Sequence, residues 1–185
     1  NNKGHELGTC MSHPESDLMY VNIPKNASSW TKPNLLDWGW EFYNYRKDNL
    51  NKHALVVLRD PVERWVSGIA EYFALYFPEF SFSSKETYQL VLDKITFDDH
   101  TEKQVYFIKD VDLIRSTFLR VDEGLRDNLE RWLKQFNYRT NIQIALEYNT
   151  SEGPKRDLIN KFTLEINNNP AYKARLEKYF ADDYK

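Results

Sequence analysis

The sequence predicts an α/β protein with three layers, in which a mostly parallel central sheet is flanked by helices. Short apolar segments typical of buried strands alternate with segments whose apolar residues recur every three or four positions, as on one face of a helix. The chain has 185 residues, 41% of them hydrophobic, which suffices for one well-packed core. Because no repeat or flexible linker interrupts it, we expect residues 1–185 to form a single domain.

The first elements are a polar arm, a strand and a helix. Residues 1–16 are polar and without a regular pattern, and we interpret them as an arm. Residues 17–23 form an apolar run that predicts a strand. A turn of small polar residues follows, and a helix begins after it, with Ser28 or Ser29 as the expected N-cap.

The second strand is predicted for residues 54–58, a continuous β-rich run of the kind that is covered on both faces. Asp60 is the expected cap of the next helix and Pro61 suits its first position. Apolar spacing extends this helix over residues 62–76. Further helices are predicted for residues 85–95, 125–136, 157–166 and 171–180, and a further strand for residues 113–121.

Both strand-to-helix junctions carry residues suited to anions, and ligands of parallel sheets bind beyond the carboxyl ends of the strands. Lys25 leads the first loop into a helix start, where free amides and the helix dipole attract phosphate. Ser28 and Ser29 add hydroxyl donors. At the second junction, Arg59 and Ser67 are predicted to bind another phosphate from two directions.

Two separate anion sites suit a nucleotide with phosphates at both ends of its ribose. A nucleoside triphosphate would need one contiguous loop, and the Gly-x-x-x-x-Gly-Lys-Ser/Thr pattern of the triphosphatases is absent. Lys25 precedes the small residues of its loop instead of following glycines. This order argues against a kinase.

The two junctions resemble the donor-binding motifs of sulfotransferases. Residues 23–30 (IPKNASSW) resemble the 5′-phosphosulfate loop, and residues 58–67 (LRDPVERWVS) resemble the 3′-phosphate motif, in similar order and spacing. The closest likeness is to carbohydrate sulfotransferases of the chondroitin, HNK-1 and heparan type. Weaker similarities to that group occur at residues 97–104, 119–125, 148–151 and 176–184.

The resemblance implies a P-loop-kinase-like nucleotide-binding core and a single sulfotransferase domain. The implied reaction passes a sulfuryl group from 3′-phosphoadenosine 5′-phosphosulfate (PAPS) to a hydroxyl of a small molecule or glycan, leaving 3′,5′-diphosphoadenosine (PAP), without a metal. Lys25 is implied to stabilise the bridging and 5′-phosphate oxygens. Ala27 replaces a glycine of many relatives, which predicts a different loop path. The implied donor-binding residues are Lys25, Asn26, Ala27, Ser28, Ser29, Trp30, Arg59 and Ser67.

The residue that activates the acceptor hydroxyl has two candidates, Glu41 and His100. Residues 37–43, around Glu41, are dense in aromatics and are a candidate wall for the acceptor. Asp99 flanks His100, and a carboxylate partner can orient an imidazole. His53 precedes its strand, at the opposite end of the sheet, and is predicted to be structural.

Other side chains have two interpretations. Trp30 suits either the core or a surface that stacks on the nucleotide base. Arg64 is predicted to be structural, paired with Asp60 one turn earlier. Lys155 and Arg156 are either a lid over the nucleotide or a solvated pair.

Composition restricts the partners. A net charge of −3 gives no general attraction for nucleic acid or anionic membranes, and no apolar run could span a bilayer. A single cysteine, Cys10, excludes an intramolecular disulfide, and a glycan at the Asn26 sequon would block the phosphate loop. These features favour the cytoplasm, although the chain begins without Met and a trimmed Golgi-luminal protein stays open.

Three other functions compete with a sulfotransferase. The first is a kinase-like phosphotransferase on the same fold, which would need Mg²⁺ ligands and a glycine-rich loop. The second is a nucleotide-binding homologue without catalysis, and the third is a structural domain without a ligand. Nucleotide binding and transfer assays discriminate among them.

Overall fold

The computed structural model describes residues 10–13, 16–43, 52–77, 85–108, 111–121, 123–135 and 154–184. The chain divides into two compact units. The first, which we call the sheet unit, comprises Asn1–Arg59 and Phe107–Asn149. The second, the helical unit, comprises Asp60–Tyr106 and Thr150–Lys185.

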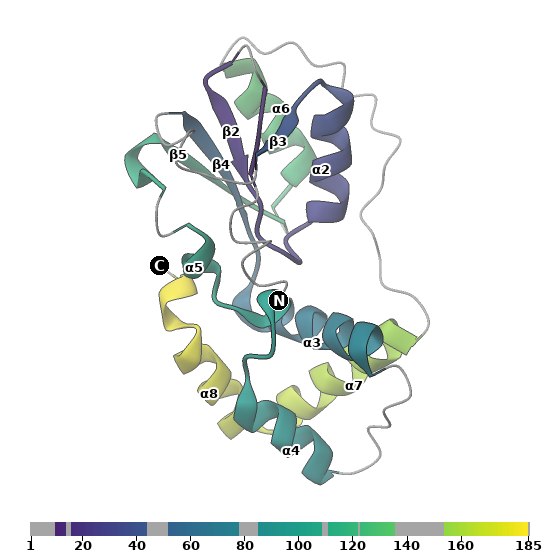
Figure 1. Ribbon diagram of the computed structural model, residues 1–185. Helices are drawn as coiled ribbons and strands as arrows, with labels where there is room; N and C mark the ends of the chain where they lie inside the picture. Colours follow the sequence, from purple (N-terminus) through teal and green to yellow (C-terminus); the bar gives the residue numbers. More distant parts are fainter. Residues whose placement is uncertain are drawn as a thin grey trace. The chain divides into compact units, whose positions relative to one another are not determined.

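The sheet unit contains a five-stranded sheet of order β3-β1-β2-β4-β5. β2 pairs in parallel with β4, and β4 with β5, whereas β1 is antiparallel to both β2 and β3 (Figure 1). The α/β class is confirmed, but the sheet is mixed, so the prediction of a mostly parallel sheet is wrong. The strands are β1 (Cys10–Ser12), β2 (Leu18–Val21), β3 (Glu41–Tyr43), β4 (His53–Leu58) and β5 (Ser116–Arg120).

The antiparallel strand β1 lies in the segment that the sequence analysis interprets as a polar arm. Its residues Cys10, Met11 and Ser12 are fully buried, so that interpretation is wrong for residues 10–12. Only residues 13–17 separate β1 from β2, and this connection is too short for a parallel crossover. Three residues are also too few to show the alternation by which a strand is recognised in a sequence.

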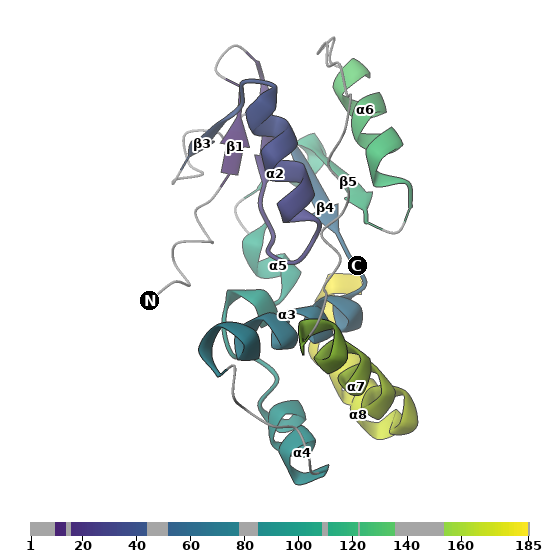
Figure 2. The same cartoon turned by 90° about the vertical axis from the view of Figure 1, so that its right-hand side faces the viewer.

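The two faces of the sheet are covered by different segments. α2 (Ser28–Asp37) and α6 (Leu125–Gln135) pack on one face, against Leu55 and Val57 of β4 (Figure 2). On the other face, Val56 of β4 packs against a cluster that includes Phe107 and Val111. β4 is therefore apolar on both faces, as its sequence predicts.

The helical unit is built around α3 (Pro61–Tyr76), whose residues Trp65, Ile69 and Phe73 are buried. Figure 2 shows α7 (Pro154–Asn168) and α8 (Pro170–Tyr179) side by side, and both contribute to the same core as α3 and α4 (Lys85–Lys94). The predicted helices are thus confirmed. Short helical turns complete the chain: η2 (Asp99–Thr101), α5 (Gln104–Phe107), η3 (Leu113–Arg115) and η4 (Ala181–Tyr184).

One predicted strand differs from the structure in its bounds. The strand predicted for residues 113–121 begins with the helical turn η3, and only Ser116–Arg120 is extended. The hydroxyl of Ser116 and the carboxylate of Asp112 bond to the backbone of this turn and favour it over a strand.

Among the helices that the structure describes, none is long and apolar enough to cross a membrane.

Candidate functional site

The loop after β2 has an unusual backbone. The amide of Asn26 donates to the carbonyl of Ile23 at 3.3 Å, which closes a turn with Pro24 in second and Lys25 in third position. Lys25 has φ 69° and Ala27 has φ 59°. Left-handed backbone costs a non-glycine residue about 1 kcal/mol, and such strain is typical of functional loops. Ala27 therefore adopts a conformation that glycine favours.

The helix α2 begins without a side-chain cap. Its N-cap is Ala27, whose carbonyl accepts the amides of Trp30 and Thr31. The amides of Ala27, Ser28 and Ser29 donate no hydrogen bond within the described residues. The prediction of a serine cap is wrong, because Ser28 and Ser29 already belong to the helix. Three uncommitted amides at the positive end of a helix dipole form an arrangement suited to an anion.

The two predicted phosphate motifs meet in the sheet unit. The side-chain amide of Asn26, which is fully buried, donates to the Val57 carbonyl of β4 at 2.9 Å. The guanidinium of Arg59 donates to the Lys25 carbonyl at 3.1 Å. Both bonds cross between neighbouring parallel strands, so the two junctions lie at the same edge of the sheet. Asn26 positions the loop with its side chain and does not present that side chain to a ligand.

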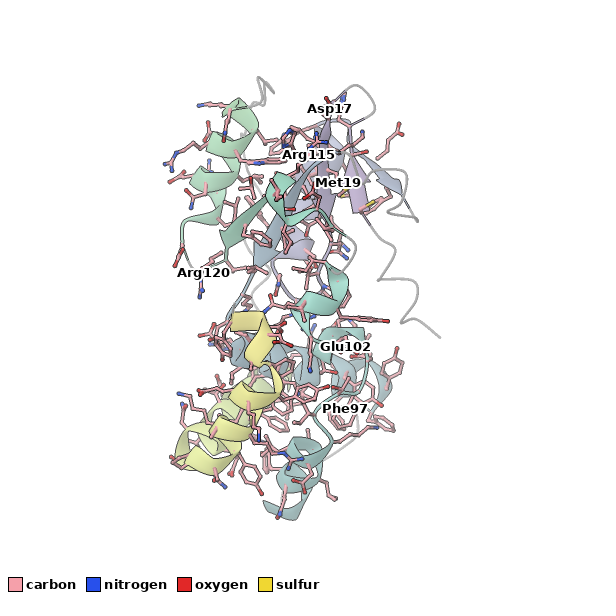
Figure 3. All side chains as sticks on the ribbon, turned by 90° about the vertical axis from the view of Figure 1, so that its left-hand side faces the viewer. Asp17, Met19, Phe97, Glu102, Arg115 and Arg120 are labelled. Atoms are coloured by element: carbon pink, nitrogen blue, oxygen red, sulfur yellow. The ribbon has the colours of Figure 1, made fainter. Side chains whose placement is uncertain are left out.

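Arg120 is a third basic residue at this edge, to which the sequence analysis assigns no role. It is paired in register with Leu58, the residue before Arg59. Figure 3 shows Arg120 and Asp17 at opposite ends of the sheet. Its side chain is 46% exposed and lies 3.5 Å from Glu123. The available signal was its position at the end of a predicted strand, where ligands of parallel sheets bind.

Two aromatic predictions are corrected. Trp30 is 2% exposed and packs in the core beneath α2, so its ring does not form a stacking surface for a base. Trp40 is also 2% exposed and lies in the same core, so its ring cannot contribute to an aromatic wall for an acceptor, whereas Phe42 is 46% exposed. In both cases the burial of a large ring stabilises the fold more than exposure would.

Glu41 does not reach the loop. Ser12 of β1 is opposite both Glu41 and Met19, so Glu41 is level with the start of β2 and two strands away from it. Two strand spacings place Glu41 about 10 Å from β2. The exposed Glu41 is therefore not retained as a candidate base.

His100 lies in the helical unit and has a carboxylate partner. Its Nδ1 is 2.9 Å from Oδ2 of Asp98, and Oδ1 of Asp98 accepts the His100 amide at 3.0 Å. The expected partner was Asp99, but in this tight turn the partner is Asp98, two positions before His100. Nε2 of His100 contacts no hydrogen-bonding partner among the described residues. It is thus the nitrogen that could accept a proton.

The His100 turn is fixed against α3 by Gly68. A Cβ added to Gly68 would lie 2.1 Å from the His100 carbonyl oxygen, so only glycine permits this approach. Ser67, the neighbour of Gly68, is 7% exposed. Because Ser67 belongs to the helical unit and Arg59 to the sheet unit, their joint binding of one phosphate stays a prediction.

The segment after His100 is held by a buried arginine and a half-buried carboxylate. Arg64 is 1% exposed and donates to the carbonyl of Glu102, which Figure 3 labels. Asp183 accepts the amides of Gln104 and Val105 at 2.8 and 2.9 Å. Burial raises the pKa of Asp183, while these two amides and the Arg64 guanidinium act in the opposite direction. Arg64 thus has a structural contact, with Glu102.

Lys155 forms an ion pair with Glu71 at 2.6 Å, which joins the first turn of α7 to α3. This contact orders Lys155 within the helical unit and gives no support to the lid interpretation.

No group of three metal-ligating side chains occurs within the part of the chain that the structure describes.

Comparisons of the chain with protein-family models, with curated proteins and with solved structures find no match in any of the three.

Proposed function

We propose that the protein is a PAPS-dependent sulfotransferase whose acceptor is a hydroxyl, with carbohydrate as the preferred class. The observation that carries the proposal is the basic edge of the sheet unit. Lys25, Arg59 and Arg120 follow or end three neighbouring parallel strands, and they accompany the three uncommitted amides of Ala27, Ser28 and Ser29. Cations and free amides together favour a polyanionic ligand.

In this proposal the 5′-phosphosulfate occupies the loop from Lys25 to Ser29. The acceptor oxygen attacks sulfur as the bond from sulfur to the bridging phosphate oxygen breaks, and PAP leaves with the electron pair. The Lys25 ammonium and the amides of α2 stabilise the charge that develops on that oxygen. Little covalent chemistry is needed from the protein, because such transfers depend on positioning and electrostatics.

The 3′-phosphate is proposed to bind Arg59 and Ser67, as the resemblance implies. His100 is the proposed base, since Asp98 orients its ring and Nε2 is uncommitted. It accepts the proton of the attacking hydroxyl. The P-loop-kinase-like character of the core belongs to the same proposal.

Thermal denaturation with PAP, ADP and ATP tests the donor half. PAP at about 100 times its dissociation constant should stabilise the chain by roughly 2.7 kcal/mol. Lys25→Ala should weaken PAP binding about tenfold. Lys32→Ala, which removes a lysine farther along α2, should leave it unchanged.

A transfer assay with labelled sulfate donor and a pool of acceptor glycans tests the chemistry. Lys25→Ala should lower the rate about 100-fold or more. Stabilisation by ATP without stabilisation by PAP would contradict the proposal and favour a kinase-like phosphotransferase. PAP binding without transfer to any acceptor would identify a non-catalytic homologue.

A further inference from the structure

The helical unit contains a cavity of about 690 Å³ that no part of the proposed transfer reaction uses. The start of α3, the end of α7, α8 and η4 surround it. Val62, Val66 and Ile166 supply an apolar wall. The volume falls in the range of pockets that enclose small organic ligands, about 300–1,000 Å³.

Three carboxylates line the same cavity: those of Asp60, Glu63 and Glu177. None of them makes an ion pair within the described residues, and one oxygen of Asp60 accepts the Glu63 amide at 3.0 Å. Lys173 is the one basic residue among those that line the cavity, and it pairs with none of the three. The cavity therefore has an excess of negative charge.

Two carboxylates of the helical unit outside the cavity are compensated. Glu71 pairs with Lys155, and Asp93 pairs with Arg175, each at 2.6 Å. These two carboxylates have a lysine or arginine partner, whereas the three that line the cavity have none among the described residues. This difference is what a site for an external cation requires.

Tyr184 reports the potential in the cavity that it lines. Burial raises the pKa of Tyr184 to about 12, and the carboxylates of Asp60, Glu177 and Asp183 contribute in the same direction. Burial disfavours a charge of either sign, so only the contribution of the carboxylates to this pKa indicates a potential that favours a positive charge.

We propose that this cavity binds a small organic cation of the polyamine class. Its ammonium groups contact Asp60, Glu63 and Glu177, and its methylene segments lie on the apolar wall. A bare divalent metal ion would leave that wall uncovered, whereas a neutral ligand would leave the carboxylates uncompensated. A polyamine matches both parts, because it alternates charge with methylene groups.

Calorimetric titration of the full chain with spermidine at low ionic strength tests the proposal. Spermidine should bind at one saturable site. Glu63→Gln and Glu177→Gln should each weaken binding about tenfold. Glu165→Gln, on α7 but outside the cavity, should leave it unchanged. Lys173→Gln should tighten binding, because it removes the cation on the rim.

Parallel titrations with MgCl₂ and with 1,8-octanediol complete the test. If Mg²⁺ displaces spermidine at equal concentration, the site is a simple acidic cluster and the proposal fails. Equal binding of the diol would show that the carboxylates play no part. The proposal also fails if spermidine does not bind at all, or if the wild type, Glu63→Gln and Glu177→Gln bind it with equal affinity. PAP binding by the same samples tests the sheet unit separately.

Discussion

The first turns of α2 and α3 follow neighbouring parallel strands, yet they are built in opposite ways. α2 begins at a left-handed alanine with no side-chain cap, and its first amides are uncommitted. α3 begins at Asp60, whose carboxylate accepts the amide of Glu63, with Pro61 in the first position. The start of α2 is thus open to an anion, whereas the chain itself closes the start of α3.

The charges near the two helix starts extend this difference. Lys25 precedes α2, and Arg59 donates to its carbonyl. Around the start of α3, Asp60 and Glu63 face a cavity together with Glu177. A helix start therefore does not by itself indicate an anion site. What decides is whether its amides are already bonded and which charges surround them.

The largest expected effect comes from the contact that holds the open loop in place. Asn26→Ala removes the donor to the Val57 carbonyl and leaves that buried acceptor unsatisfied, so it should lower the free energy of unfolding by about 2 kcal/mol. Urea unfolding measures the change. Asn128→Ala removes an exposed amide that donates to Glu123, and should cost much less. Equal losses would show that Asn26 does not fix the loop.

The contrast between the two helix starts was only half predictable from the sequence. Asp60 followed by Pro61 is a strong local signal, because a capping carboxylate and a fixed φ act within the same turn. Ser28 and Ser29 are equally typical of an N-cap, but neither is the N-cap of α2. The left-handed Ala27 took the cap position, and the side chain of its neighbour Asn26 is bonded to Val57 of β4, far away in the sequence.

The second expected effect compares the caps directly. Asp60→Ala removes the carboxylate that accepts the Glu63 amide and should destabilise the protein by about 1 kcal/mol. Ser28→Ala removes no cap bond and should change the free energy of unfolding by less than about 0.5 kcal/mol. With PAP present, only Ser28→Ala should reduce ligand-induced stabilisation. A larger loss of stability for Ser28→Ala would mean that its hydroxyl caps the helix after all.

The residues of the candidate site were predictable where neighbours in the sequence determine their surroundings, and not where distant segments do. Lys25 and Arg59 could be proposed from the sequence because ligands of parallel sheets bind in the loops that follow the strand ends. Glu41 and Trp30 were misassigned because their surroundings depend on strand order and core packing, which one sequence does not display. His100 stays a proposed base, but the carboxylate at its ring is that of Asp98 instead of Asp99, since a tight turn brings Asp98 there.

The smallest expected effect is a pH dependence at the acidic start of α3. The pKa of Tyr184 is raised to about 12, first by burial and then by Asp60, Glu177 and Asp183. An unfolded tyrosine ionises near pH 10, so between about pH 10 and 12 the unfolded chain loses a proton that the folded chain keeps. Stability should therefore fall as pH rises above about 10, and should not change from this cause below it. Because Tyr184 is half exposed, the slope should be shallow.

Urea unfolding between pH 9 and 11.5 measures how the free energy of unfolding falls with pH. Tyr184→Phe should remove this contribution to the fall. Tyr76→Phe, in the last turn of α3, should keep it. Glu177→Gln should reduce it in part, because one of the three contributing carboxylates is then neutral. If the free energy of unfolding depends on pH in the same way in Tyr184→Phe and Tyr76→Phe, Tyr184 is not the source of the alkaline slope.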